Sequence, residues 1–367
     1  MEEFILEENK SFQVRTDLAI EAKEMYVEDK AKKEKQGVIV KDRLEDDIKI
    51  TDVLVNKQGE KEIGKKEGTY ITIYADGVKR QDTKKQDKAA KVLALEIKKL
   101  LEKKKVLKKQ TALIVGLGNW QVTPDALGPM TTDKIMVTSH LFQLEYENVH
   151  EGYRPVASIQ PGVMGVTGIE TSDIIYGVVD KFKPDFIIAI DALAARSIER
   201  VNETIQLTDT GIQPGSGVGN RRKELSEEVL GIPVFAIGVP TVVDAVTIAS
   251  DTIDYILKHF GREWKEKDKL SKKLTPFNLP FQSKPFSEED LPNKQQSNTV
   301  LGLIGNLTDA EKRTLISEVL TPMGQNLMVT PKEVDGFMVD MADLLARGIN
   351  AALHENVTIN NASTYTR

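Results

Sequence analysis

The chain has 367 residues, carries 50 lysines and arginines against 56 aspartates and glutamates for a formal net charge of -6, and contains no cysteine. Disulfides, thiolate nucleophiles and cysteine-ligated zinc or iron–sulfur centres are therefore excluded. The mild acidity gives no support for direct binding to nucleic acid. The longest uncharged runs have 15 residues, fewer than the roughly 18–20 that a membrane-spanning helix needs. Because the N-terminus is acidic, unlike a secretory signal, we expect a cytoplasmic protein.

The first third of the chain is rich in charge. Residues 25–47 are charge-dense, and we expect them to be exposed. Strand-like runs at 48–55 and 69–75 predict a long β-hairpin. Apolar residues at helical spacing predict an amphipathic helix from Asp82 to about Lys104. Eleven lysines lie between positions 81 and 110, which favours a solvated helix face, with electrostatic attraction of an acidic partner as the alternative.

The centre of the chain alternates strands and helices. Strands are predicted at 112–115, 156–159, 186–190, 204–207 and 234–237, and helices at 171–182 and about 241–258. This alternation predicts an α/β fold with a mostly parallel sheet flanked by helices. Residues 262–298 are polar and contain four prolines, so an exposed insertion is expected there. Helices follow at 308–320 and 331–353.

Two aspartates follow buried strands at the sheet edge where α/β proteins bind ligands. Asp125 comes after the glycine turn Gly116–Asn119, at the start of a predicted helix, and Asp191 directly follows the apolar run 186–190. Singly, each has an ordinary structural interpretation, as a charge at a helix start or a turn residue. Together they predict a carboxylate pair, in which one member holds a water as base and the other supplies a proton.

The familiar hydrolase motifs are absent from the sequence. There is no HExxH pair, G-x-S-x-G elbow or S-x-x-K stretch, and no histidine has a companion that suggests metal binding. Backbone N–H groups of the turn that contains Gly116, Gly118 and Asn119 are candidates to bind an oxyanion. The glycine-rich loops at 161–168 and 215–222 either line the same cleft or are plain connections.

Five segments resemble the spore germination protease family of spore-forming Firmicutes: VRTDLAIEAKE (14–24), GLGNWQVTPDALGP (116–129), QPGVMGVTGIET (160–171), IIAIDALAARS (187–197) and TDTGIQPGSGVGNRR (208–222). The resemblance implies an endopeptidase that degrades small acid-soluble DNA-binding proteins when a spore germinates. It implies an atypical aspartate-dependent hydrolase with Asp125 and Asp191 as its catalytic pair. We expect no cofactor, with a bound metal as the alternative. It also implies a homotetramer in the cytoplasm of the developing spore and in the spore core.

The family resemblance further implies a zymogen that processes itself. Family substrates are cut after an acidic and before an apolar residue, and Thr16-Asp17-Leu18-Ala19 is such a motif. Residues 1–17 are therefore expected to be a propeptide, cleaved between Asp17 and Leu18; the alternative is a frayed terminus. Residues 18–367 then form one α/β peptidase domain, with an accessory hairpin at 48–75, the insertion at 262–298 and a C-terminal helical segment at 308–353.

Three alternatives stay open at this point. The family's fold is similar to that of hydrogenase-maturation peptidases, which use an acidic site to bind nickel, so a metal-dependent peptidase is one alternative. A phosphorylase-type or nucleotide-binding enzyme on a similar sheet is another. The third is a non-catalytic assembly protein in which Asp125 and Asp191 only stabilise the ends of structural elements.

Overall fold

The computed structural model describes residues 16–29, 37–144, 149, 151–213, 224–266, 290–292, 302, 307–320 and 327–362. The predicted loop at 215–222 and most of the propeptide and insertion lie outside these residues. Within them, contacts divide the chain into two compact units. The larger unit comprises residues 16–243 and 330–362, and the smaller comprises 244–329.

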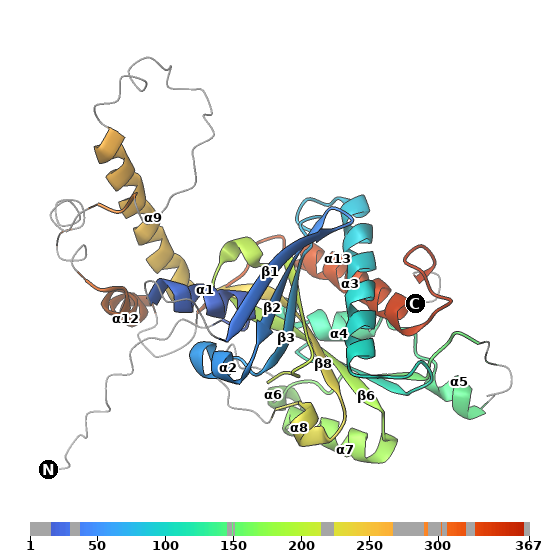
Figure 1. The fold of residues 1–367 in the computed structure, drawn as a ribbon. Coiled ribbons are helices and arrows are strands. Elements are labelled where there is room, and N and C mark those ends of the chain that lie inside the picture. The colour runs from blue at the N-terminus through green and yellow to red at the C-terminus, as the bar shows by residue number, and fades with distance from the viewer. Residues whose placement is uncertain are drawn as a thin grey trace, which may run out of the picture. The chain divides into compact units, whose positions relative to one another are not determined.

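One mixed β-sheet organises the larger unit (Figure 1). Its strands lie in the order β1 (Val38–Glu45), β2 (Ile48–Val55), β3 (Gly68–Tyr74), β7 (Thr204–Thr208), β8 (Val234–Asp244), β6 (Phe186–Ala195), β4 (Ala112–Gly116) and β5 (Val156–Ile159). The strands from β8 to β5 are parallel, whereas those from β1 to β8 pair antiparallel. The predicted α/β class is confirmed. The hairpin β2–β3 joins the same sheet through β7.

Helices cover both faces of this sheet. On one face, α3 (Thr83–Lys103) and α13 (Val334–Leu353) bury their apolar stripes against β4, β6 and β8. On the other, α7 (Thr171–Phe182) packs against the remaining side chains of β4 and β6. The shorter helices of this unit are α1 (Ala19–Asp29), α2 (Lys57–Ile63), α4 (Leu127–Thr132), α5 (Ser139–Leu144), α6 (Met164–Thr167) and α8 (Glu227–Leu230), with 3-10 turns η1 (Thr123–Asp125) and η3 (Ile198–Arg200).

The smaller unit is helical. In it, α9 (Ala245–Glu266) packs against α12 (Asp309–Leu320), and β9 (Met328–Val329) follows. An ion pair between Lys312 Nζ and Asp254 Oδ1, 2.6 Å apart, joins the two helices. Of the predicted insertion, residues 262–266 belong to α9. No helix of the described residues is long and apolar enough to span a membrane.

The predicted ends of two central strands are wrong. β6 continues beyond Ile190 to Ala195, and β8 continues through Pro240 to Asp244, where a helix had been expected from Thr241. The two strands extend because they pair with each other, and β-branched residues at 241–243 favour a strand. A register shift after Leu193 accommodates Pro240, since a proline within a sheet is tolerated at such irregularities.

The charge-dense stretch at 25–47 contains a strand that was not predicted. Val38–Glu45 forms β1, which pairs with β2 at the edge of the sheet. Charged residues are common on edge strands, where they oppose pairing with other chains. The expected exposure therefore holds for much of β1, although its backbone is ordered in the sheet.

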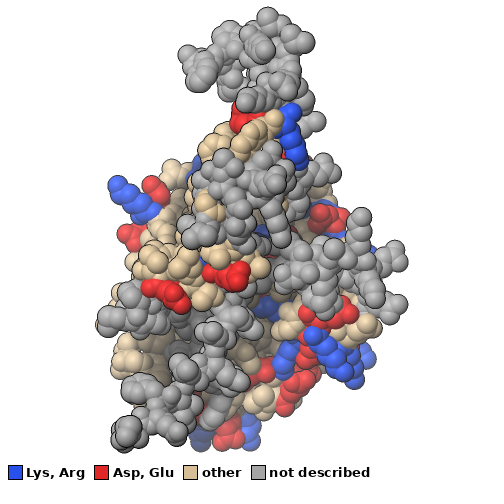
Figure 2. Space-filling model, turned by 90° about the vertical axis from the view of Figure 1, so that its left-hand side faces the viewer, with Lys and Arg blue, Asp and Glu red and all other residues tan. Residues whose placement is uncertain are grey.

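The lysine-rich helix α3 and its flanks are paired with acidic groups of the same chain. Ion pairs within 4.0 Å involve Lys85, Lys88, Lys91, Lys99, Lys103, Lys104 and Lys108. Figure 2 draws another side of the molecule, on which described side chains of both charge signs also lie. The ion pairs of α3 and its flanks favour the solvated helix face over a one-sign surface that attracts an acidic partner.

Two glycines provide a matched test of close packing in this fold. A Cβ atom at Gly128 would lie 2.2 Å from the Leu117 carbonyl oxygen and 2.6 Å from that of Ile190, whereas one at Gly177 would meet nothing within 4 Å. We expect Gly128→Ala to lower the free energy of unfolding by about 1–3 kcal/mol. Gly177→Ala, in mid-helix, should raise it by about 0.5–1 kcal/mol. Urea denaturation measures both, and a fully stable Gly128→Ala protein would contradict the close approach.

A buried histidine makes stability depend on pH. His354 Nδ1 accepts a hydrogen bond from the Arg154 backbone N–H at 3.2 Å. Burial lowers the pKa of His354 to about 4, although a backbone hydrogen bond with Met136 acts to raise it. The unfolded chain therefore binds a proton between pH about 6.5 and 4 that the folded protein does not.

We expect this linkage to remove about 3 kcal/mol of stability as the pH falls through that window. The contribution is complete above the ordinary histidine pKa and is lost towards pH 4. His354→Gln should flatten the pH dependence of the free energy of unfolding, which urea denaturation at a series of pH values measures. Equal slopes for wild type and His354→Gln would contradict the assignment.

Candidate active site

The segment after β4 folds back against β6. β4 stops pairing with β6 at Gly116 and Ile190, and the Leu117 N–H then donates to the Ile190 carbonyl at 2.8 Å. Gly128, in α4, lies against the same carbonyl. The 3-10 turn η1, which ends at Asp125, packs on β6. The structure therefore places the Asp125 segment beside β6 near Asp191, the first β6 residue beyond the last pair with β4.

The topology makes this point a switch in the sheet. The chain runs from β4 outward to β5, crosses back to β6 on the other side of β4, and continues toward β7 and β8. Connections leaving β4 and β6 therefore diverge, and α/β proteins bind ligands at the crevice that such divergence opens. Asp125 follows one of these two strands and Asp191 lies on the other.

Asp191 lies within β6 and not at its tip, which corrects the expected position. It is the first β6 residue beyond the last pair with β4, and it pairs with Gly238 of β8. The alternation of β6 side chains places it on the sheet face that α7 covers, together with Ile187 and Ala189. Asp191 is only 6% exposed, and its Oδ1 accepts the Ala192 N–H at 2.9 Å.

Asp125 is half-buried at the end of a tight loop. Its carbonyl accepts the Asn119 N–H at 3.0 Å, and a Cβ at Gly118 would lie 1.9 Å from that carbonyl oxygen. Gly118 has a φ of 116°, which a side chain would strain. Because the Asn119 N–H is engaged inside the loop, it can bind an oxyanion only after this bond breaks. The oxyanion role of Gly116, Gly118 and Asn119 stays a prediction.

Side chains from other strands hold this loop in place. Thr241 Oγ1, on β8, donates to the Pro124 carbonyl at 2.7 Å. Gln160, just after β5, accepts from Trp120 Nε1 at 2.8 Å. Trp120 and Val122 are nevertheless about half exposed. The Asp125 loop therefore offers apolar surface next to a carboxylate.

The predicted cleavage site is bound to the edge of β6 that β4 leaves unpaired. The Asp17 N–H donates to the Ala194 carbonyl at 3.0 Å, and the Ala194 N–H donates to Asp17 Oδ2 at 2.9 Å. Leu18 and Ala19 are fully buried. The Asp17–Leu18 peptide is therefore enclosed by the protein in this structure.

Residues missed by the sequence analysis hold this segment. Glu21, 1% exposed, accepts the Arg196 and Ser197 N–H groups at 2.6 and 3.0 Å and pairs with Arg200 at 3.1 Å. Burial acts to lower the pKa of Arg200, but the hydrogen bonds and charges of Glu24 and Glu21 outweigh it and raise that pKa. The sequence offers no local signal for these contacts, because they join residues about 175 positions apart.

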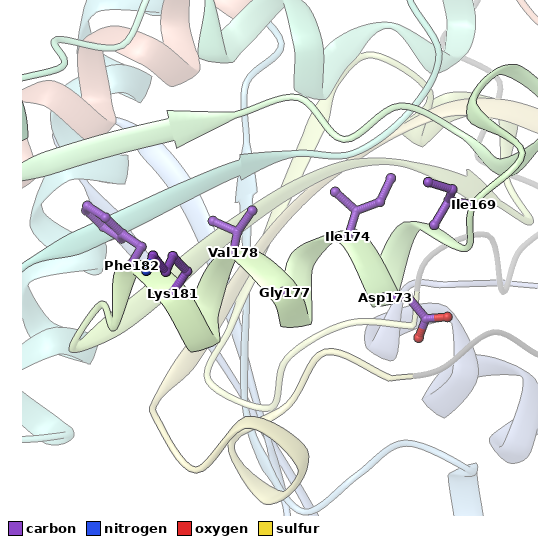
Figure 3. Close-up of a pocket in the computed structure, with 7 residues that line it drawn as sticks. All are labelled: Ile169, Asp173, Ile174, Gly177, Val178, Lys181 and Phe182. Carbon is purple, nitrogen blue, oxygen red and sulfur yellow. The ribbon is translucent and has the colours of Figure 1, made fainter.

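A separate apolar groove runs along α7 (Figure 3). Ile174, Val178 and Phe182 line it on one side of the helix, and Ile169 closes one end. Neither Asp125 nor Asp191 lines this groove. Among the described residues, no three histidine or acidic side chains are grouped to hold a metal ion.

The fold and the site together define an α/β protein with two carboxylates at the switch point of its sheet. The sequence profile described as germination protease matches residues 19–366. A germination protease of Oceanobacillus iheyensis is 66% identical over 365 residues, covering 98% of this chain and all of the relative. A germination protease of Bacillus cereus is 58% identical over 358 residues and covers 97% of both chains.

The chain belongs to the germination protease family. This membership confirms the family resemblance found in the sequence, and it makes the protein a peptidase that acts on protein substrates. It favours the peptidase over the phosphorylase-type enzyme and the non-catalytic assembly protein. The catalytic residues, the propeptide and the substrates stay predictions.

Proposed function

We propose that the protein is an endopeptidase that begins the degradation of small acid-soluble DNA-binding proteins during spore germination. The observation that carries this proposal is the near full-length similarity to germination proteases. We also propose that it acts as a homotetramer in the cytoplasm of the developing spore and in the spore core. Both of these details rest on the family resemblance.

We propose Asp125 and Asp191 as the catalytic pair. The adjacency of their two segments, through the bond from Leu117 to Ile190, supports this assignment. Asp125 is the more exposed of the two, so we assign it as the base that takes a proton from water. The water oxygen adds to the scissile carbonyl carbon, Asp191 protonates the leaving nitrogen, and the C–N bond breaks to give a carboxylate and an amine.

We propose that the full-length chain is a zymogen that cuts itself between Asp17 and Leu18. The acidic-then-apolar sequence at this position supports the proposal, and so do the ordered contacts that hold it against β6. Removal of residues 1–17 would vacate this edge of the sheet beside Asp191. A peptide substrate then has access to backbone groups that Asp17 occupies in the zymogen.

The catalytic pair is tested by isosteric replacement. We expect Asp125→Asn and Asp191→Asn each to fold normally and to lose peptide cleavage by on the order of 10²–10⁴-fold, because neither amide transfers a proton. Asp180→Asn, at an exposed position on α7, is the matched control and should retain full activity. Initial rates on a peptide with an acidic-apolar junction give the comparison. Substantial activity in either site variant would remove that residue from the mechanism.

Self-processing is tested by sequencing the product's new N-terminus. Purified full-length protein, incubated over a series of pH values, should yield a chain that begins at Leu18. We expect the rate to rise below neutral pH, because protonation changes the charge of the catalytic pair and of propeptide carboxylates. A product that begins at any other residue would reject the Asp17–Leu18 site.

A further inference from the structure

Two side chains donate hydrogen bonds to the carbonyl oxygen of Asp17. Lys65 Nζ lies 3.0 Å from this oxygen and Gln206 Nε2 lies 3.3 Å from it. Lys65 also donates to the Thr16 carbonyl at 3.1 Å. This carbonyl belongs to the peptide bond between Asp17 and Leu18. A cation and an amide therefore converge on the oxygen that becomes negatively charged when that bond is attacked.

Both neighbours of the bond are fixed as well. Gln206 Oε1 accepts the Ala19 N–H at 2.7 Å, so one side chain bridges the two ends of the Asp17–Ala19 segment. Asp17 is held on Ala194 through its N–H and its carboxylate. The peptide cannot rotate away from its donors without breaking these bonds.

The register of the sheet relates this carbonyl to Asp191. Gln206 pairs with Gly238, and Gly238 pairs with Asp191, so the three residues form one row whose side chains share a face. Adjacent strands are about 4.8 Å apart, which places the backbones of Gln206 and Asp191 about 10 Å apart. Gly238 contributes no side chain to this row. The Asp17 carbonyl and Asp191 therefore lie on the same side of the sheet.

We propose that Lys65 and Gln206 are catalytic residues of self-processing, which bind the Asp17 carbonyl oxygen and stabilise its negative charge. The inference rests on the proposed cleavage between Asp17 and Leu18. Asp125 takes a proton from water as the water oxygen adds to the carbonyl carbon, and the carbonyl oxygen gains charge against Lys65 and Gln206. Asp191 then protonates the Leu18 nitrogen and the C–N bond breaks, which leaves an amine at Leu18 and a carboxylate at Asp17.

The electrostatic setting of Lys65 fits this role. Burial has the largest effect on this group and lowers the pKa of Lys65, while the charges of Asp17 and Glu21 act to raise it. Lys65 is half-buried, so its interaction with a developing oxyanion is screened less than at a fully exposed site. The adjacent Lys66 instead pairs with Glu224 and Glu228.

The competing interpretation is that Lys65 only anchors the N-terminal segment. The two interpretations differ in what happens when the lysine is lost. An anchor would leave the junction looser, so an added endopeptidase that cuts after acidic residues should cleave it faster, and self-processing should not slow. An oxyanion donor would leave the junction bound and slow its chemistry.

The experiment uses the full-length chain carrying Lys65→Met, with Lys66→Met as the matched control. We expect Lys65→Met to slow self-processing by on the order of 10²–10³-fold, with an unchanged melting temperature and unchanged sensitivity to the added endopeptidase. Lys66→Met should process at the wild-type rate. Gln206→Glu keeps the acceptor for Ala19 and loses the donor, so it should also slow processing.

Three other outcomes would overturn the inference about Lys65 and Gln206. Processing of Lys65→Met within threefold of wild type, equal slowing in Lys66→Met, or faster cleavage by the added endopeptidase would overturn the inference. If Lys65→Met does not fold, the Gln206→Glu variant tests the inference instead. An unchanged rate of self-processing in Gln206→Glu would overturn the proposed role of Lys65 and Gln206. A wild-type chain that never yields an N-terminus at Leu18 would instead contradict the proposed function itself.

Discussion

The bond from the Leu117 N–H to the Ile190 carbonyl is the interaction on which the site depends. It is made where β4 stops pairing with β6, at the start of the turn that returns Asp125 to the sheet. Such a turn is possible only because glycines stand at the points of contact. Gly128 and Gly118 each bring backbone within a distance that a Cβ would prevent. The glycine-rich sequence around Asp125 is thus explained by packing, independently of any direct chemical role.

The early end of β4 also creates the place where the N-terminal segment binds. Beyond Ile190, no strand of the described residues pairs with this edge of β6, and buried backbone groups need partners. Asp17 supplies them at Ala194, and Glu21 supplies them at Arg196 and Ser197. In the proposed processing, the contacts of Asp17 are lost while those of Glu21 stay with the chain. An extended substrate that adds along the same edge of β6 can replace the contacts of Asp17.

The sequence predicts the elements of this fold better than their ends. Apolar runs and helical spacing locate the central strands and the helices α3, α7 and α13, because these signals are local. The extension of β6 to Ala195 is not local, because it depends on pairing with β8. Asp191 was therefore placed at a strand tip, although it lies inside a strand. Lys65 is one of many lysines in a charged stretch, and only the fold distinguishes it by bringing it to residue 17.

The candidate pair itself illustrates what a sequence does and does not determine. A carboxylate after a buried strand is common, and neither Asp125 nor Asp191 is distinctive alone. What places their segments side by side is strand order, since β5 lies outside β4 and the chain must cross back to form β6. Had β6 been added beyond β5, the two aspartates would be separated by a strand and no crevice would open between their connections. The chemistry proposed here therefore depends on one crossover, which no segment of the sequence specifies by itself.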